Sequence, residues 1–462
     1  MKRILILFFL LAPGAFCGQK TWRISQVEGD ATATIQRALD DAYLAGGGKV
    51  VIRKGIYNVG GLRLRSNTCL YLKKGAVLKG SRDCSAYRIL DRETLELPDS
   101  SDLAPDGAPW TPPRTRLNGN APHFSKAWSE WNDAVIRIYK AENVSIVGEE
   151  GSVIDGCNSY NPNGEEYFRG VHGISAIKCR NLVLKGYTIQ KTGNWAHIIQ
   201  KSSDITISNL KILAGHDGVH MNTCDRVNIS CCTIKTGDDC IAGFDNRDVT
   251  VKNCFLSSAC SAFRWGGTRF LAENCICEGP CDFPARGTLS REEKEQGAMT
   301  GLKARTAMLG LFTYYADRTI TIREAPGDIV FRNITCRGAQ RFIHYNMSGS
   351  ETWQLGSPLA DVHFENVNAA GIKNPLCAYG TEDCPINLYF KDCSISFESE
   401  MPEFIRGAFI GAIHINGLTV EGVSGPFYRQ WMDMTAGMDI TGLSGIQASS
   451  SPGEGKFIVK RI

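Results

Sequence analysis

Short stretches in which apolar and polar residues alternate recur along much of the chain. Five of them follow closely on one another and begin at Leu182, Ile205, Val227, Val249 and Phe270. The steps between these starts are 23, 22, 22 and 21 residues. Similar stretches begin at Val144, Ile329, Val362 and Ile386. A period of two between apolar and polar residues predicts half-buried β-strands.

Repetition at a spacing near 22 residues predicts a solenoid. The strands have no helical segment between them, which excludes a leucine-rich repeat with helices. A right-handed parallel β-helix fits, because each turn buries its apolar face only by stacking on its neighbours. We therefore predict an all-β, single-domain parallel β-helix of about ten turns over residues 18–462, in which positions about 22 apart stack roughly 4.8 Å from one another.

The region near the N-terminus carries one helical pattern. Thr34–Ala45 reads TIQRALDDAYLA and precedes three glycines. We expect this helix to cap the open end of the solenoid and prevent edge pairing. Residues 85–135 and 281–318 interrupt the repeat, and we expect long loops beside a cleft there.

The first residues have the features of a secretory signal peptide over residues 1–17. Lys2 and Arg3 precede a short apolar run and then small residues. The run is too short for a stable membrane span, and no later segment is long and apolar enough to cross a membrane. We expect export to the periplasm or the medium, with a lipid anchor on Cys17 as the alternative.

Composition and charge narrow the classes of function. The chain has 462 residues, of which 43% are hydrophobic and 21% charged, so it can bury a large core. A net charge of +3 without a dense Lys/Arg run argues against nucleic acid as a partner. A weakly positive surface tolerates an acidic polysaccharide.

The chain has 18 cysteines, and their positions matter more than their number. Cys232, Cys254 and Cys275 follow the repeat and are expected to form one buried column of small hydrophobic side chains. Cys377 and Cys384 are the best candidates for a disulfide. No Cys-x-x-Cys pair lies beside histidines at zinc spacing, so we expect no metal.

Acidic residues recur at the repeat spacing in the middle of the chain. Residues 215–220 read GHDGVH, and residues 237–242, one turn later, read GDDCIA. Asp217 and Asp239 are 22 residues apart, so they should share one column, with Asp238 beside them. Like charges this close raise at least one pKa. Glycoside hydrolysis needs a protonated carboxyl group and an ionised one. A polar corner turn and a calcium site are the alternatives.

These motifs resemble glycoside hydrolase family 28, the polygalacturonase family. Its usual motifs are Asn-Thr-Asp, Gly-Asp-Asp, Gly-His-Gly and Arg-Ile-Lys. Residues 237–242 match the second motif, while the first keeps the Asp-Gly and loses Asn-Thr. The resemblance runs from about residue 30 into the 270s. It implies that Asp238 is the general acid, that Asp217 and Asp239 hold the attacking water, and that hydrolysis inverts the anomeric centre.

Two departures from the family pattern bear on the substrate. Ala259-Cys260-Ser261 stands where the family has Gly-His-Gly, and no Arg-Ile-Lys is present. His216, 22 residues before Asp238, is a candidate to replace the missing histidine. The basic residues that could bind an acidic sugar are Arg264, Lys303, Arg305 and Arg323, with Arg264 best placed, on the column of His220 and Ala242. These losses favour a modified or branched pectin, or an oligosaccharide end, over plain polygalacturonate.

Aromatic residues complete the predicted site. Trp195 lies 22 residues before Asp217, so its ring could pack against a sugar face, while the Trp265, Tyr314, Tyr315 and Trp353 rings have less clear roles. We predict substrate binding by His216, His220, Arg264 and Trp195. The predicted enzyme is a monomeric hydrolase of galacturonan or rhamnogalacturonan that needs no cofactor. A polysaccharide lyase on the same fold and a non-catalytic carbohydrate-binding solenoid are the alternatives.

Overall fold

The structure is a computed structural model that describes residues 20–87, 133–160, 170–281, 307–316, 322–347, 354–430, 447–450 and 456–460. The predicted signal peptide, Cys17, Lys303, Arg305 and Trp353 lie outside these ranges. So do most of the two interruptions in the repeat. The predictions on those residues stay predictions, as does the single domain over residues 18–462.

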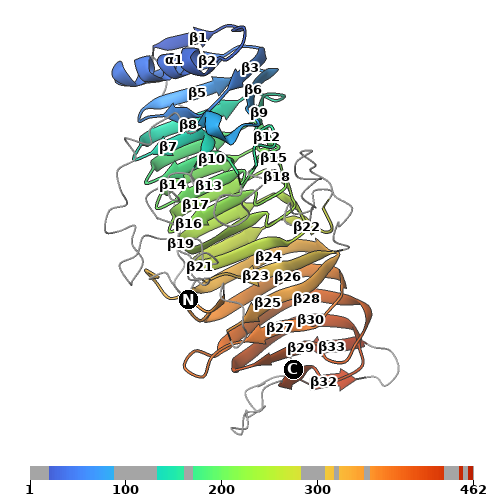
Figure 1. The fold of residues 1–462 in the computed structure, drawn as a ribbon. Coiled ribbons are helices and arrows are strands. Elements are labelled where there is room, and N and C mark those ends of the chain that lie inside the picture. Colours follow the sequence, from blue (N-terminus) through green and yellow to red (C-terminus); the bar gives the residue numbers. More distant parts are fainter. Residues whose placement is uncertain are drawn as a thin grey trace.

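The described strands stack turn upon turn into a right-handed parallel β-helix, from the blue N-terminal turns to the red C-terminal ones in Figure 1. Strand pairing divides the coil into three faces. Face 1 contains β1 (Thr21–Ile24), β2 (Gly48–Ile52), β5 (Thr68–Leu72), β8 (Glu142–Gly148), β11 (Arg180–Lys185), β14 (Ser203–Ser208), β17 (Asp225–Ser230), and parts of the long strands β19 (Ile241–Lys252), β21 (Ser261–Glu273), β24 (Gly327–Arg337), β26 (Asp361–Ile372), β28 (Ile386–Met401) and β30 (Ile410–Val423).

The other two faces share the long strands. Face 2 contains β4 (Leu62–Leu64), β7 (Ala134–Tyr139), β10 (His172–Ile177), β13 (His197–Gln200), β16 (Val219–Asn222), the first parts of β19 and β21, β23 (Met308–Tyr314), β25 (Ala339–Asn346), β27 (Leu376–Tyr379), β29 (Ile405–Ala408) and β31 (Tyr428–Gln430). Face 3 contains β3 (Gly55–Val59), β6 (Ala76–Gly80), β9 (Val153–Asp155), β12 (Thr188–Gln190), β15 (Lys211–Ala214), β18 (Thr233–Thr236), β20 (Phe255–Ser258), β22 (Ile276–Glu278) and the later parts of β24, β26, β28 and β30.

The remaining named elements lie near the ends of the coil. The short 3-10 helix η2 (Cys84–Tyr87) follows β6. Strand β33 (Lys456–Lys460) pairs antiparallel with β30 and with β32 (Gln447–Ser450). The pairings between the other named strands are parallel.

The predicted repeat sets the observed register. Leu182 pairs with Ile205, and the column continues through Val227, Val249 and Phe270. These side chains point into the core, where all five are almost fully buried. Burial of a side chain of this size contributes about 1.5–3 kcal/mol, so a slip of one residue would turn the whole column towards solvent.

The single α-helix of the described residues closes the N-terminal end of the coil. Helix α1 covers Thr32–Leu44, close to the predicted Thr34–Ala45. It buries Ile35, Leu39 and Ala42 and contacts strands β2 and β4 of the first turns. Figure 1 shows the helix at the blue end of the stack, where it covers core that no further turn protects.

No disulfide joins cysteines within the described ranges. Cys232, Cys254 and Cys275 are buried in consecutive turns, as predicted. The predicted Cys377–Cys384 disulfide is wrong in this structure. The Cys377 thiol lies in β27 against the Tyr345 carbonyl (3.8 Å), whereas Cys384 lies in a turn bonded to Thr381.

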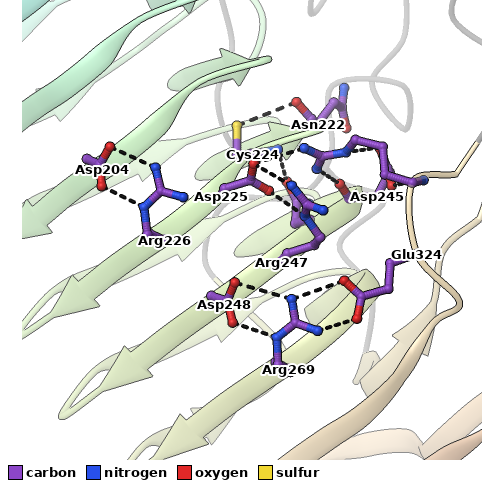
Figure 2. A network of polar contacts seen from close by, with 12 residues as sticks. Asp204, Asn222, Cys224, Asp225, Arg226, Asp245, Arg247, Asp248, Arg269 and Glu324 are labelled. Carbon is purple, nitrogen blue, oxygen red and sulfur yellow. Dashed lines mark hydrogen bonds and ion pairs between the residues drawn. The ribbon is translucent and has the colours of Figure 1, made fainter. Parts of the chain in front are cut away.

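Ion pairs join consecutive turns on the outside of the coil (Figure 2). They include Arg226 with Asp204, Arg247 with Asp225, and Arg269 with both Asp248 and Glu324. Exposed pairs of this kind contribute little each, about 0–1 kcal/mol. Their positions show that the chain around Glu324, which follows a long interruption of the repeat, lies against the turns of residues 248–269.

No helix in the described part of the chain is long and apolar enough to span a membrane.

Candidate active site

The three predicted carboxylates lie at one corner of the coil, between faces 3 and 2. Asp217 follows β15, and Asp238 and Asp239 follow β18 one turn later. Backbone hydrogen bonds hold these turns in register, since Gly218 N–H donates to the Asp239 carbonyl at 2.9 Å. Cys240 N–H donates to the Ser261 carbonyl, also at 2.9 Å. The predicted column is therefore present.

The Asp217 carboxylate accepts hydrogen bonds at both oxygens. Its Oδ1 accepts the backbone N–H of Asp239 at 3.2 Å, and its Oδ2 lies 2.6 Å from Nδ1 of His220. Asp217 is only 3% exposed. Two donors aimed at a buried carboxyl group favour its ionised form, because they replace the water that burial removes.

Asp239 lies deeper in the same corner and is 2% exposed. Its Oδ1 accepts the Ser261 backbone N–H at 2.9 Å, and its Oδ2 is 3.8 Å from Nη1 of Arg264. Burial raises the pKa of Asp239 to about 7, and the negative charges of Asp238 and Asp217 add to that rise, while Arg264 and the Ser261 bond oppose it. The cluster therefore holds a proton at mildly acidic pH.

Asp238 is the most accessible of the three and is half-buried. The turn that carries it is fixed from both sides, because its backbone carbonyl accepts hydrogen bonds from Thr236 Oγ1 (2.8 Å) and Ser258 Oγ (2.6 Å). A carboxylate oxygen of Asp238, one of Asp239 and Sγ of Cys260 all lie within 4.8 Å of one another. Calcium prefers six to eight oxygen ligands, so a thiol beside a guanidinium makes this corner a poor calcium site.

His220 is held between aromatic rings. The Trp195 indole stacks on the imidazole with 3.8 Å between ring centroids and 5° between planes, and the Tyr315 ring meets it edge-on at 6.1 Å. Burial lowers the pKa of His220 to about 3, although Asp239 pulls in the opposite direction. The imidazole is therefore neutral over the range in which most enzymes work.

Trp195 does not offer the open ring face that the sequence suggested. It is 8% exposed, and one face of the ring lies against His220. The prediction of this ring as a platform for sugar is corrected on that point, because the imidazole occupies the stacking position. The residue is nevertheless in the predicted column, since the neighbouring Ala196 N–H bonds to the Asp217 carbonyl.

Arg264 lies on the predicted column, paired with Ala242, which in turn pairs with His220. Its guanidinium lies over the Tyr315 ring at 4.9 Å and beside Asp239. Such a cation–π contact contributes about 0.5–2 kcal/mol and fixes the plane of the group. The positive charge of Arg264 thus lies beside the carboxylate cluster and lowers the pKa of Asp239.

The other predicted residues lie elsewhere or add little. His216 is buried next to Asp217 in the chain, and its role as the replacement histidine stays a prediction. Arg323 does not face the site as a sugar ligand, because it bonds to Asp245 (2.8 Å) and Asp225 (3.0 Å). Trp265 and Tyr314 are core side chains, and the Tyr314 hydroxyl donates to the Ser357 carbonyl.

Three contributors were not assigned to the site from the sequence. Ser261 is 22 residues after Asp239, so the repeat rule could have found its backbone donor. Tyr315 follows a long interruption, and no periodic signal places it against His220 and Arg264. His197 donates from Nδ1 to the Gly218 carbonyl (3.0 Å) and supports the turn after Asp217.

Comparisons with known proteins find similarity over part of the chain. Residues 110–259 match the family described as Glycosyl hydrolases family 28. A polygalacturonase of Phaedon cochleariae is 29% identical over 140 residues, which cover 25% of this chain and 35% of that protein. A probable polygalacturonase of Arabidopsis thaliana is 34% identical over 156 residues, which cover 30% and 33%. The chain thus spans about a third of the length of these relatives.

A solved structure shares the fold over a longer stretch. The family 28 exopolygalacturonase of Yersinia enterocolitica matches with a TM-score of 0.59 and 15% identity, over 90% of this chain and 79% of that one. At this identity the likeness concerns the fold alone.

Proposed function

We propose that the chain, whose residues 110–259 match glycosyl hydrolases family 28, is a member of that family and hydrolyses α-glycosidic bonds of a pectin-type polysaccharide or oligosaccharide. The observation that carries the proposal is the convergence of Asp217, Asp238 and Asp239 from two consecutive turns. Burial and mutual repulsion keep one proton in this cluster. Glycoside hydrolysis requires such a pairing of a protonated with an ionised carboxyl group.

The accessibilities of the three groups support distinct roles. Asp238, the half-buried one, delivers the proton to the leaving oxygen. Asp217 accepts two hydrogen bonds, stays ionised and takes a proton from the attacking water. Asp239 shares the cluster's proton with Asp238 before the reaction and helps to position the water. Attack by water opposite to the leaving group inverts the anomeric centre.

The surroundings of Arg264 bear on the substrate. Its guanidinium is engaged by Asp239 and Tyr315, so it is poorly placed to pair with a sugar carboxylate. Together with the absence of the family's Gly-His-Gly and Arg-Ile-Lys motifs, this favours a branched or modified pectin such as a rhamnogalacturonan. The predicted signal peptide supports action outside the cytoplasm, and we propose that the protein acts there as a monomer.

A panel of defined pectic oligosaccharides tests the proposal, with products followed by reducing-end release, by ultraviolet absorbance and by the anomeric NMR signals. We expect saturated products with inverted configuration. The variant Asp238→Asn should lose about 100-fold or more in kcat while it still binds substrate. Asp383→Asn, at an exposed position, is the matched control and should keep full activity.

Two outcomes would contradict the proposal. Products that absorb in the ultraviolet would show an eliminating lyase. Binding of a glycan without any cleavage by the wild type would favour a non-catalytic carbohydrate-binding protein.

A further inference from the structure

His220 approaches Asp217 across a very tight turn. The two residues are three apart, and Nδ1 of the imidazole is 2.6 Å from Oδ2 of the carboxylate. Gly218 between them is required, since a Cβ there would lie 2.6 Å from Ile234 Cγ2 and 2.7 Å from the Cys240 carbonyl oxygen. The turn can therefore bring the imidazole to the carboxylate only because that position has no side chain.

The ring of His220 has little freedom to move. It is 3% exposed and lies parallel to the Trp195 indole of the preceding turn. The Tyr315 ring, from beyond a long interruption of the repeat, meets it at 81°. Contacts on a face and at an edge fix the plane of the imidazole, and that plane directs Nδ1 at Asp217.

Burial keeps the His220 imidazole neutral, which leaves it one N–H to donate. The charges of Asp239 and Asp238 favour a protonated ring, whereas burial and the nearby Arg264 oppose it, and burial has the largest effect. Asn222, from the same strand, also favours the protonated ring, and the Tyr315 ring, which follows β23, meets the imidazole edge-on. A neutral imidazole holds one N–H, and an ionised carboxylate can only accept. The N–H therefore lies on Nδ1.

We propose that His220 is a positioning residue that holds the Asp217 carboxylate ionised and oriented towards the attacking water. This inference rests on the proposed role of Asp217 as the base. Cys260 stands where the family has a histidine, and a thiol is a weak hydrogen-bond donor. His220 donates a hydrogen bond from a neutral imidazole to Asp217 of the same cluster. Because the imidazole is neutral, it brings no extra acidic proton that could transfer to the Asp217 base.

Two substitutions separate this role from plain packing. His220→Leu removes the donor and keeps an apolar side chain, whereas His220→Asn keeps an N–H near the position of Nδ1. Loss of the donor should raise the pKa of Asp217. We expect His220→Leu to lower kcat about 100-fold with KM nearly unchanged, and to move the acid limb of the kcat/KM profile up by about one pH unit. His220→Asn should recover most of the rate and the wild-type limb.

Other results would overturn the inference. If both variants lose the same activity and the acid limb does not move, His220 acts by packing alone. Because the Leu variant could fold poorly, the wild type offers a second measurement. In protein with ¹⁵N-labelled histidine, NMR should show the His220 proton on Nδ1 from about pH 5 to 8, and a proton on Nε2 would rule out the role. If the wild type cleaves no glycan, both the proposed function and this inference fail. If the wild type is active but the acid limb of His220→Leu lies at the wild-type pH, only the inference fails.

Discussion

The backbone N–H of Asp239 donates to Oδ1 of Asp217 at 3.2 Å, across one turn of the coil. This bond couples the position of one carboxylate to the backbone that carries the other two. Both residues are almost completely buried, so a second negative charge in the corner is costly.

The pH dependence of activity should show an alkaline limb near pH 7. Burial and the charges of Asp238 and Asp217 raise the pKa of Asp239 to about 7, so the carboxylate cluster holds a proton below that pH. As pH rises through 7 the cluster loses the proton that the leaving group needs, so kcat/KM should fall. Steady-state rates from pH 4 to 9 check this, and constant activity from pH 6 to 9 would contradict it.

Arg264 should set the position of that limb. Its guanidinium is 3.8 Å from Asp239 and lowers the pKa of that carboxyl group. Arg264→Gln removes the charge, so the alkaline limb should move to higher pH by about one unit. Arg264→Lys keeps the charge and should move it less. A limb at the same pH in all three proteins would show that Arg264 does not act on the cluster.

His197 should make the fold sensitive to acid. Its Nδ1–H donates to the Gly218 carbonyl, and Nε2 accepts from the Tyr187 hydroxyl (3.1 Å). Burial lowers the pKa of His197 from 6.5 to about 4. Between pH 6.5 and pH 4, His197 therefore binds a proton in the unfolded chain but not in the folded protein. This contribution to stability is full above pH 6.5 and is lost as pH falls towards 4, by up to about 3 kcal/mol.

The variant His197→Asn keeps a donor for Gly218 but cannot titrate. Denaturant unfolding followed by circular dichroism should find this variant less stable than the wild type at pH 7. The difference should shrink as pH falls to 4. A difference that stays constant over this range would show that His197 does not titrate on unfolding.

Arg323 should stabilise the fold instead of binding substrate. Its guanidinium bonds to Asp245, whose side chain is 2% exposed, and to Asp225, and both aspartates appear in Figure 2. Arg323→Gln leaves the buried Asp245 charge without this partner and should cost about 3 kcal/mol of unfolding free energy. Asp245→Asn in the same protein should recover a large part of the loss. Additive effects in this double-mutant cycle would contradict the pairing.

The sequence alone determined the coil and the column of acidic residues. A repeat of nearly constant length converts distance along the chain into position on the surface, because each turn uses the same number of residues. Leu182, Ile205 and Val227 therefore stack as their spacing predicts. The same rule brings Asp217 and Asp239 together and places Arg264 on the column of His220.

Only the tertiary structure decided how the side chains around those carboxylates are used. The repeat says which residues share a column but not where a ring points, because rotamers depend on packing from every side. Trp195 therefore stacks on His220 and not on an open cleft. Tyr315 and Arg323 follow stretches that break the repeat, so their contacts with Arg264 and Asp245 had no periodic signal. Spacing fixes positions along a regular coil, while side-chain direction and long insertions are settled by the packing of the whole molecule.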